Sequence, residues 1–190
     1  MDQKSICRIS KQDDLITVCD LGKHHLCGNF PSSIDEDIPS ASLSLGWSPS
    51  SNLLQLRNEN DITDMYGDNY GYRSGLNISM VNHLKDKVNS LKKKYNYKNL
   101  SCVLDIGSND GTTLSFYPED IKRIGIDPTI KKFGKYYQKG IIKVESFFDA
   151  DIFFKASNNQ KADIITSISM FYDLPDPGKF VEDIAAILSP

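Results

Sequence analysis

Two aspartates and two glycines in the middle of the chain have a spacing that suits ligand binding. Residues 102–114 read C-V-L-D-I-G-S-N-D-G-T-T-L: an apolar run ends at Asp105, a turn with Gly107 and Gly111 follows, and a helical pattern begins at Thr112. Glycine allows the backbone to approach a ligand closely, and a helix N-terminus offers free N–H groups. This order of strand, tight turn and helix predicts a loop that binds a nucleotide-type cofactor.

The spacing and charge of this loop distinguish between nucleotide cofactors. The residues between the two glycines are Ser108, Asn109 and Asp110. A dinucleotide loop would have G-x-G-x-x-G instead, and a P-loop would have a lysine after its last glycine. Carboxylates at Asp105 and Asp110 would repel a pyrophosphate, whereas they attract the sulfonium and ammonium groups of S-adenosylmethionine. The pattern therefore favours S-adenosylmethionine over NAD or ATP.

A second short apolar run also ends in an acid. Residues 123–127 read R-I-G-I-D, and Pro128 and a helical stretch follow. An acid about 20 positions after the glycine turn, at the end of the next strand, can accept hydrogen bonds from both ribose hydroxyls. Either acid alone would be explained better by capping the turn after it. Because Asp105 and Asp127 both stand at strand ends, we interpret them and Pro128 as parts of one cofactor site.

The rest of residues 76–190 alternates between helical and extended patterns. Helices are expected at 76–97, after Gly111, at 130–138, 149–156 and 178–188, with strands ending at Asp105 and at 124–127, 141–144 and 163–168. Alternating strands and helices give a parallel sheet with helices on both faces, so the predicted fold class is α/β and Rossmann-like. Residues 1–75 are rich in Ser, Asn, Asp and Pro, and we expect a separate module of short strands and loops there.

Bulk properties exclude several partners. The formal charge is −3 and the isoelectric point is about 5.6, which gives no electrostatic case for nucleic acid binding. No apolar run approaches the roughly 20 residues that span a bilayer, and residues 1–5 are polar. We therefore expect a cytoplasmic protein without a membrane segment. The four cysteines form no C-x-x-C pair.

Several segments resemble the sugar C-methyltransferases that act on nucleotide-linked deoxysugars. They are V-C-D-L-G-K-H-H-L-C-G-N-F at 18–30, L-L-Q-L at 53–56, Y-G-Y-R-S-G at 70–75 and S-M-F-Y-D-L-P-D-P at 169–177. The resemblance implies a class I methyltransferase that uses S-adenosylmethionine to methylate a carbon of a nucleotide-linked keto-sugar. It also implies an N-terminal module similar to a zinc-binding domain.

The chain departs from that family where the metal would bind. Cys7 stands at the first ligand position, but Ser10, Ser48 and Ser51 stand at what resemble the other three. Serine is a poor zinc ligand, so no zinc is expected. The residues His24, His25, Cys19 and Cys27 remain open as substitutes, although their spacing is unlike C-x-x-C. Without metal, the module must rely on packing, for which Trp47, Phe30 and the leucines are candidates.

Further site residues follow the third and fourth strands. Phe147 and Phe148 could lie against an adenine, with core packing as the competing explanation. Ser169 and Met170 belong to the loop after the fourth strand, which should line a ligand site in an open α/β sheet. The resemblance makes Tyr70, Tyr72 and Tyr172 candidate substrate contacts.

The resemblance leaves catalysis unassigned. The family continues beyond the equivalent of residue 190 with further strands and a His-Glu-His signature, so we expect this chain to be a fragment that lacks the C-terminal half of the enzyme and its catalytic base. Three alternatives stay open: an O- or N-methyltransferase of a small molecule, a binding module with a degenerate site, and an NAD-dependent sugar-modifying enzyme.

Overall fold

The chain forms two compact units. The computed structural model describes residues 6–26, 31–58, 66 and 70–190. One unit contains residues 1–71 together with 172–179, and the other contains residues 72–171 and 180–190. The sequence placed the boundary after residue 75. Phe30 and Cys27, both singled out from the sequence, lie outside the described residues.

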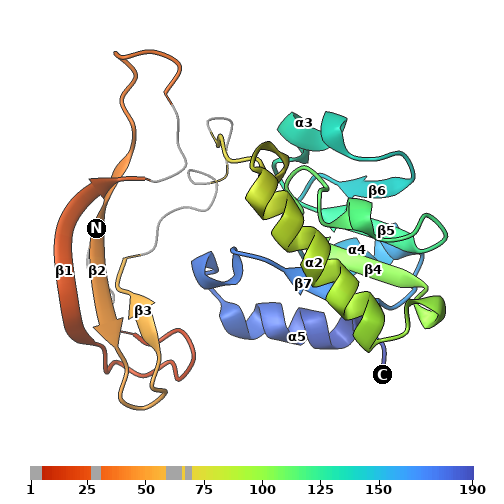
Figure 1. Ribbon diagram of the computed structural model, residues 1–190. Helices are drawn as coiled ribbons and strands as arrows, with labels where there is room; N and C mark the ends of the chain where they lie inside the picture. Colours follow the sequence, from red (N-terminus) through yellow and green to blue (C-terminus); the bar gives the residue numbers. More distant parts are fainter. Residues whose placement is uncertain (1–5, 27–30, 59–65, 67–69) are drawn as a thin grey trace. The chain divides into compact units, whose positions relative to one another are not determined.

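The N-terminal unit contains an antiparallel sheet, as the sequence predicted. Its strands are β1 (Ile16–His25), β2 (Ser40–Trp47) and β3 (Leu54–Leu56), in the order β1-β2-β3 (Figure 1). Irregularities in the register between Thr17 and Cys19 and between Asp20 and Lys23 interrupt the β1–β2 pairing. Every residue of β1 is exposed, so this strand contributes little to a core.

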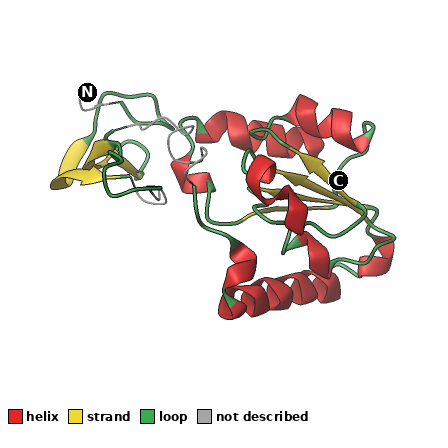
Figure 2. Ribbon diagram, turned by 90° about the horizontal axis from the view of Figure 1, so that it is seen from above, coloured by secondary structure: helices red, strands yellow, loops and turns green. Residues whose placement is uncertain are grey.

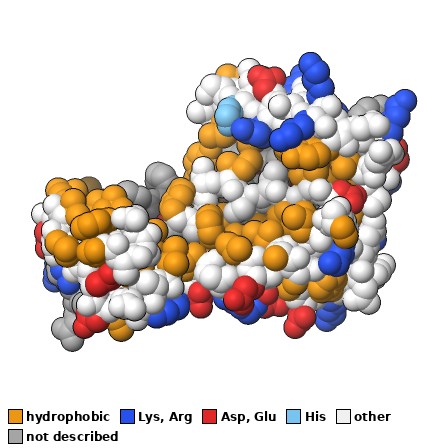
Figure 3. Space-filling view, turned by 90° about the horizontal axis from the view of Figure 1, so that it is seen from below, with side chains coloured by type: hydrophobic (Ala, Val, Ile, Leu, Met, Phe, Trp, Pro, Cys, Tyr) orange, Lys and Arg blue, Asp and Glu red, His pale blue; other side chains and the backbone are white. Residues whose placement is uncertain are grey.

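The interior of this unit is polar, contrary to the expectation of an apolar core. Trp47 is 38% exposed, and apolar side chains are visible at the surface of the unit (Figure 3). The buried positions among its described residues carry small or polar residues: Cys7, Ser44, Gly46, Ser48, Gln55 and Asn58. Packing of Trp47 and the leucines is therefore a wrong prediction for the described residues, because hydrogen-bonding groups occupy the interior.

The second unit is the predicted α/β fold with a parallel four-stranded sheet. Its strands are β4 (Cys102–Ile106), β5 (Lys122–Ile126), β6 (Ile141–Val144) and β7 (Ile164–Ser167), in the order β6-β5-β4-β7. All three strand pairs are parallel. Helices lie on both faces of the sheet (Figure 2), as right-handed crossovers predict when the direction of strand addition reverses between β6 and β7.

Four helices accompany this sheet: α2 (Ile78–Lys94), α3 (Ile130–Phe133), α4 (Ala150–Ser157) and α5 (Pro177–Ile187). In α2 the side chain of Asn77 accepts a hydrogen bond from Ser79 N–H and caps the N-terminus. Lys92, Lys93 and Lys94 occupy its last turn, where cations complement the helix dipole. Val88 of α2 packs into a buried cluster that includes Val103, Ile141 and Ile164 from three strands.

Two predicted helices are shorter than expected. The helix expected after Gly111 is only a 3₁₀ turn, η3 (Leu114–Phe116), because Tyr117 is extended before Pro118. The stretch expected to be helical at 130–138 divides into α3 and a second 3₁₀ turn, η4 (Gly134–Tyr136). Within the described ranges, no helix combines the length and apolar character needed to cross a bilayer.

We expect Gly111→Ala to destabilise the second unit strongly. Gly111 has φ +77°, and a Cβ there would lie 2.7 Å from the ring of Tyr137. The substitution adds an overpacking cost to the cost of a left-handed backbone, so the free energy of unfolding should fall by about 2–4 kcal/mol in chemical denaturation. The matched control is Gly140→Ala, which has φ +86° but meets only the end of the Arg123 side chain at 3.4 Å. A loss of about 1 kcal/mol is expected for the control, and equal losses for both variants would contradict the proposed clash.

Candidate cofactor-binding site

The glycine loop, residues 107–111, follows β4 directly and is hydrogen-bonded to the end of β5. Gly107 and Gly111 have φ +69° and +77°, values that favour glycine, and Asn109 between them has φ +52°. Gly107 N–H donates to the carbonyl of Ile126 at 2.9 Å, and Gly111 N–H donates to the carbonyl of Ser108 at 2.9 Å. The first bond fixes the loop against the carboxyl end of β5, where an open α/β sheet binds its ligands, and the second closes the loop on itself.

Asp105 lies buried at the end of β4. It is 3% exposed and accepts a hydrogen bond of 2.5 Å from the hydroxyl of Thr166, its register partner on β7. Burial raises the pKa of Asp105 to about 7, against the hydrogen bonds from Thr166 and Thr113, and the negative charge of Asp127 raises it further. The two predicted acids therefore lie close enough to interact, as the sequence required.

Asp127 ties the glycine loop to the turn after β5. One carboxylate oxygen accepts Asn109 N–H at 2.8 Å, and the other accepts the N–H and hydroxyl of Thr129 at 2.6 and 2.5 Å. Asp127 is 6% exposed, and Pro128 follows it directly. Since each carboxylate oxygen has two lone pairs, the oxygen that faces Asn109 keeps one for a further donor. Asp127 thus caps its turn and can still accept a ribose hydroxyl.

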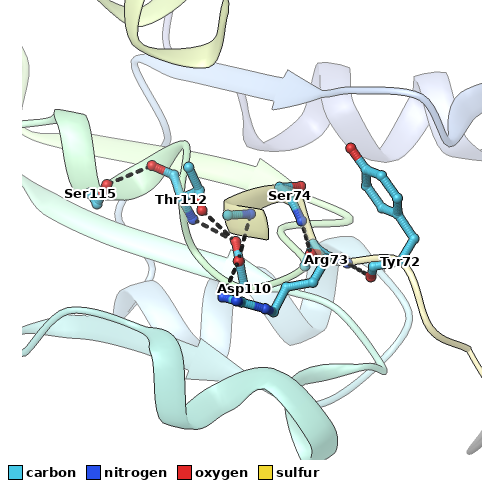
Figure 4. Close-up of polar contacts among 8 residues, drawn as sticks. Tyr72, Arg73, Ser74, Asp110, Thr112 and Ser115 are labelled. Atoms are coloured by element: carbon cyan, nitrogen blue, oxygen red, sulfur yellow. Dashed lines mark hydrogen bonds and ion pairs between the residues drawn. The ribbon is translucent and has the colours of Figure 1, made fainter. Parts of the chain in front are cut away.

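Asp110 has a different role from the one predicted. One oxygen accepts Gly75 N–H at 2.9 Å and pairs with Arg73 at 3.2 Å, and the other accepts the N–H and hydroxyl of Thr112 (Figure 4). These four donors match the four lone-pair sites of a carboxylate. The side chain of Asp110 therefore positions residues 73–75 and is not available as a cofactor ligand. Because Arg73 also neutralises its charge, only Asp105 and Asp127 remain candidates for attracting a cation.

The side chain of Asn109 holds the same segment. Its carbonyl oxygen accepts Ser74 N–H at 3.0 Å, and its amide donates to the carbonyl of Tyr72 at 3.1 Å. Arg73 also stacks on Tyr136, with 3.9 Å from the guanidinium carbon to the ring centroid. Residues 72–75 consequently belong to the second unit, which places the boundary between units earlier than the sequence indicated.

Residues from the loop after β7 reach the glycine loop. A Cβ on Gly107 would lie 3.0 Å from Cγ of Met170, so Met170 packs directly against this glycine. The hydroxyl of Ser167 donates to Sδ of Met170 at 2.8 Å, and Ser169 has φ +58°. Ser108 follows Gly107 in the loop, and its hydroxyl forms a hydrogen bond of 2.7 Å with the hydroxyl of Tyr137.

The two phenylalanines after β6 have different environments. The ring of Phe148 meets that of Phe180 edge-on, with centroids 5.4 Å apart, and Phe180 stacks on Phe171 at 5.1 Å. Phe148 therefore belongs to an aromatic packing cluster, which supports the competing explanation given for it. Phe147 is 37% exposed and remains the candidate for contact with an adenine.

The three tyrosines predicted to contact a substrate fall in different units. Tyr72 is 44% exposed, and its ring points away from Asp110 (Figure 4). Tyr70 and the exposed Tyr172 belong to the N-terminal unit, together with Tyr66. The hydroxyl of Tyr66 donates to Asp173, and its ring lies 5.2 Å from that of Tyr70. Burial, the hydrogen bond to Asp173 and the charges of its neighbours raise the pKa of Tyr66.

Sequence reasoning missed Thr166, Tyr66 and Tyr137, and it singled out Arg73 without identifying its partner. Thr166 could have been found, because aligning the strand ends places it opposite Asp105. Arg73 stands inside the Y-G-Y-R-S-G segment, but no local pattern shows that it pairs with Asp110. Tyr66 and Tyr137 give no signal in the sequence, since their roles come from contacts with distant residues.

The four positions that resemble a metal site do converge in the N-terminal unit. The thiol of Cys7 lies 3.1 Å from the hydroxyl of Ser51 and accepts Ser10 N–H at 3.5 Å. Burial raises the pKa of Cys7, but hydrogen bonds from the side chains of Ser10, Ser48 and Ser51 outweigh it and lower the pKa to about 6. One thiol and three hydroxyls do not fit a structural zinc ion.

Of the alternative ligands named from the sequence, Cys27 lies outside the described residues, and the other three do not come together. His24 and His25 face the carbonyls of Leu21 and Ile38 at 2.9 and 3.0 Å, and Cys19 is exposed. Among the described residues, no three His, Cys, Asp or Glu side chains gather in a way that could hold a metal.

Comparison with known proteins gives two family matches. Residues 7–66 match the model described as "Putative zinc binding domain", and residues 77–190 match the model described as "Methyltransferase domain". A search of curated proteins gave no significant match.

Among solved structures, one match is the crystal structure of the plantazolicin methyltransferase BpumL in complex with a pentazolic desmethylPZN analog and SAH. The match has 16% sequence identity and a TM-score of 0.44, and it covers 56% of this chain and 42% of that chain. The chain thus spans less than half the length of that protein, and the similarity carries no information about a substrate. The match to the methyltransferase domain covers more than half of this chain, and the chain therefore belongs to the methyltransferase-domain family, with the Rossmann-like fold of class I.

Proposed function

We propose that this protein uses S-adenosylmethionine to methylate a carbon atom of a nucleotide-linked keto-deoxysugar. The observation that carries the cofactor part is the meeting of Asp105, the glycine loop and Asp127 at the carboxyl ends of β4 and β5. Membership of the methyltransferase-domain family implies the same cofactor. When bound, S-adenosylmethionine supplies an electrophilic methyl group on a positively charged sulfur.

The residues present fit this cofactor. The backbone of residues 107–111 can approach its methionine part, because Gly107 and Gly111 carry no side chain. Asp127 accepts a ribose hydroxyl through its remaining lone pair, and Phe147 contacts the adenine. Ionised Asp105 attracts the cationic end of the cofactor. Ser169 and Met170 close the site from the loop after β7.

The substrate class rests on the resemblance described above and on the family match of the N-terminal residues. A keto group acidifies the neighbouring C–H bond, so a base can remove that proton and leave an enolate whose carbon attacks the methyl group. Tyr70, Tyr72 and Tyr172 are the proposed sugar contacts. The resemblance places the base in a His-Glu-His segment, which the three histidines of this chain, His24, His25 and His83, do not form.

A transfer assay separates this function from O- or N-methylation. Because the resemblance places the base outside these 190 residues, the chain is assayed together with the segment that carries the His-Glu-His signature. This protein is incubated with methyl-labelled S-adenosylmethionine and a nucleotide-linked keto-deoxysugar, and the matched control is the same sugar with its ketone reduced to an alcohol. We expect label on carbon from the keto-sugar and no transfer to the alcohol, because only the ketone stabilises the enolate. Transfer to a hydroxyl of the reduced sugar would contradict C-methylation while leaving the cofactor assignment intact.

We expect Asp127→Ala to weaken binding of S-adenosylhomocysteine at least tenfold in isothermal titration calorimetry, because both the ribose acceptor and the anchor of Asn109 are lost. The matched control is Asp163→Asn. Asp163 accepts hydrogen bonds from Ser101 and Cys102 N–H at the amino end of the sheet, away from the site. The control should lower stability without changing the dissociation constant. Equal loss of affinity in both variants would mean that Asp127 acts only through folding.

The pKa of Asp105 predicts a pH dependence of cofactor binding. With a pKa of about 7, Asp105 is mostly protonated at pH 6 and mostly ionised at pH 8. A sulfonium nearby favours the ionised form, so the affinity for S-adenosylmethionine relative to S-adenosylhomocysteine should rise by about three- to tenfold from pH 6 to pH 8. The uncharged thioether of S-adenosylhomocysteine removes this effect, while both ligands share the ammonium group. In Asp105→Asn the affinity ratio should stay constant, and a constant ratio in the wild-type protein would place the sulfonium away from Asp105.

A further inference from the structure

Two turns in the N-terminal unit share one backbone pattern. In residues 7–12, Cys7 N–H donates to the carbonyl of Gln12 at 2.8 Å, and Lys11 has φ +58°. In residues 48–53, Ser48 N–H donates to the carbonyl of Leu53 at 2.9 Å, and Asn52 has φ +57°. Each turn is thus closed between its first and sixth residues, with a left-handed residue at its fifth position.

The first and fourth residues of the two turns point their side chains at one another. These residues are Cys7 and Ser10 in one turn and Ser48 and Ser51 in the other. The sulfur of Cys7 lies 3.1 Å from the hydroxyl oxygen of Ser51 and accepts Ser10 N–H at 3.5 Å. Cys7 and Ser48 have no exposed surface. The equivalent positions of the turns therefore converge on a common buried centre.

Asp14 and Ser50 extend this contact into a network. The hydroxyl of Ser48 donates to the two carboxylate oxygens of Asp14 at 2.9 and 3.0 Å, and Ser50 N–H donates to Asp14 at 3.0 Å. The hydroxyl of Ser50 donates to that of Ser10 at 2.8 Å. Hydrogen bonds thus link the two turns at several points, and we name Cys7, Ser10, Asp14, Ser48, Ser50 and Ser51 the serine cluster.

A zinc ion does not fit the donors that the serine cluster offers. Structural zinc is held by four thiolates or imidazoles, and its ligands must be deprotonated to bind. Neutral hydroxyls at three of the four positions supply neither the charge nor the polarisable sulfur. The matched family model is described as "Putative zinc binding domain", whereas the four positions in this chain offer one thiol and three hydroxyls.

The burial pattern shows that the described part of this unit lacks an apolar core, whose stabilising role the serine cluster would take over. The described residues of this unit bury small and polar side chains, while Trp47 and most leucines are at least partly exposed. Apolar packing is therefore a weak source of stability here, and a hydrogen-bonded centre has correspondingly more weight.

We propose that the N-terminal unit joins its two turns without a metal ion, through the serine cluster, and that the turns retain the backbone geometry of a four-coordinate zinc site. Two consequences follow. The native protein folds independently of zinc, and cysteines at positions 10, 48 and 51 create a zinc site.

The native protein provides the first test. Protein expressed with added zinc should contain well under about 0.1 zinc per chain by elemental analysis, whereas a structural site would hold one ion. Trp47 is the only tryptophan of the chain and stands next to Ser48, so its fluorescence reports the unfolding of this unit. The thermal midpoint should be the same with and without EDTA. One zinc per chain, with a midpoint that EDTA lowers, would overturn the proposal.

Restoring the ligands provides the second test. The variant Ser10→Cys/Ser48→Cys/Ser51→Cys should bind about one zinc per chain, become sensitive to EDTA, and give the absorption bands of a tetrahedral thiolate site with cobalt. The matched control Ser33→Cys/Ser40→Cys/Ser42→Cys adds the same number of thiols at positions outside the cluster. A folded triple variant that binds zinc no better than this control would refute the retained geometry.

A milder variant keeps the proposal testable if the triple variant does not fold. Ser48→Ala removes both hydrogen bonds to Asp14, so the midpoint followed by Trp47 fluorescence should fall by about 4–8 °C whether or not EDTA is present. Ser42→Ala, on β2 and outside the cluster, is the control and should leave the midpoint unchanged. No shift in Ser48→Ala would show that the serine cluster does not hold the turns together.

Discussion

The hydrogen bond from Asn109 N–H to the carboxylate of Asp127 is the contact on which the geometry of the candidate cofactor site depends. It joins the glycine loop after β4 to the turn after β5, and so fixes the distance between the two parts of the chain that a nucleoside has to bridge. The parallel register of β4 and β5 brings both segments to the same edge of the sheet. Burial of the carboxylate strengthens the bond, because an unpaired buried acceptor would be costly.

The glycine loop is also held by hydrogen bonds to residues 72–75. Asn109 and Asp110 direct their side chains to residues 72–75, which immediately precede the cap of α2. The position of α2 is thereby linked to the conformation of the loop, and a shift in one would disturb the other. The three acids thus differ in role: Asp110 positions residues 73–75, whereas Asp105 and Asp127 remain the candidates for ligand binding.

Sequence patterns predicted the features that depend on local order. The alternation of strands and helices gave the α/β class, and strand ends placed Asp105 and Asp127 at one edge. The resemblance to the methyltransferase family singled out Cys7, Ser10, Ser48 and Ser51 as ligand positions, and the structure brings them together. Features that depend on distant partners could not be predicted. The saturation of Asp110 requires Gly75 and Arg73, 35 and 37 residues away, and the exposure of Trp47 follows from an interior filled by polar groups.

The assignment of residues 172–179 to the N-terminal unit has a consequence for biosynthesis. Arg8 donates to the carbonyl of Leu174, and Tyr66 donates to Asp173, so these contacts cannot form until the ribosome has translated that segment. At about 5–20 residues per second, the 108 codons between positions 71 and 179 take about 5–20 s. The first part of the nascent polypeptide to emerge is therefore completed only after the strands of the parallel sheet have been synthesised.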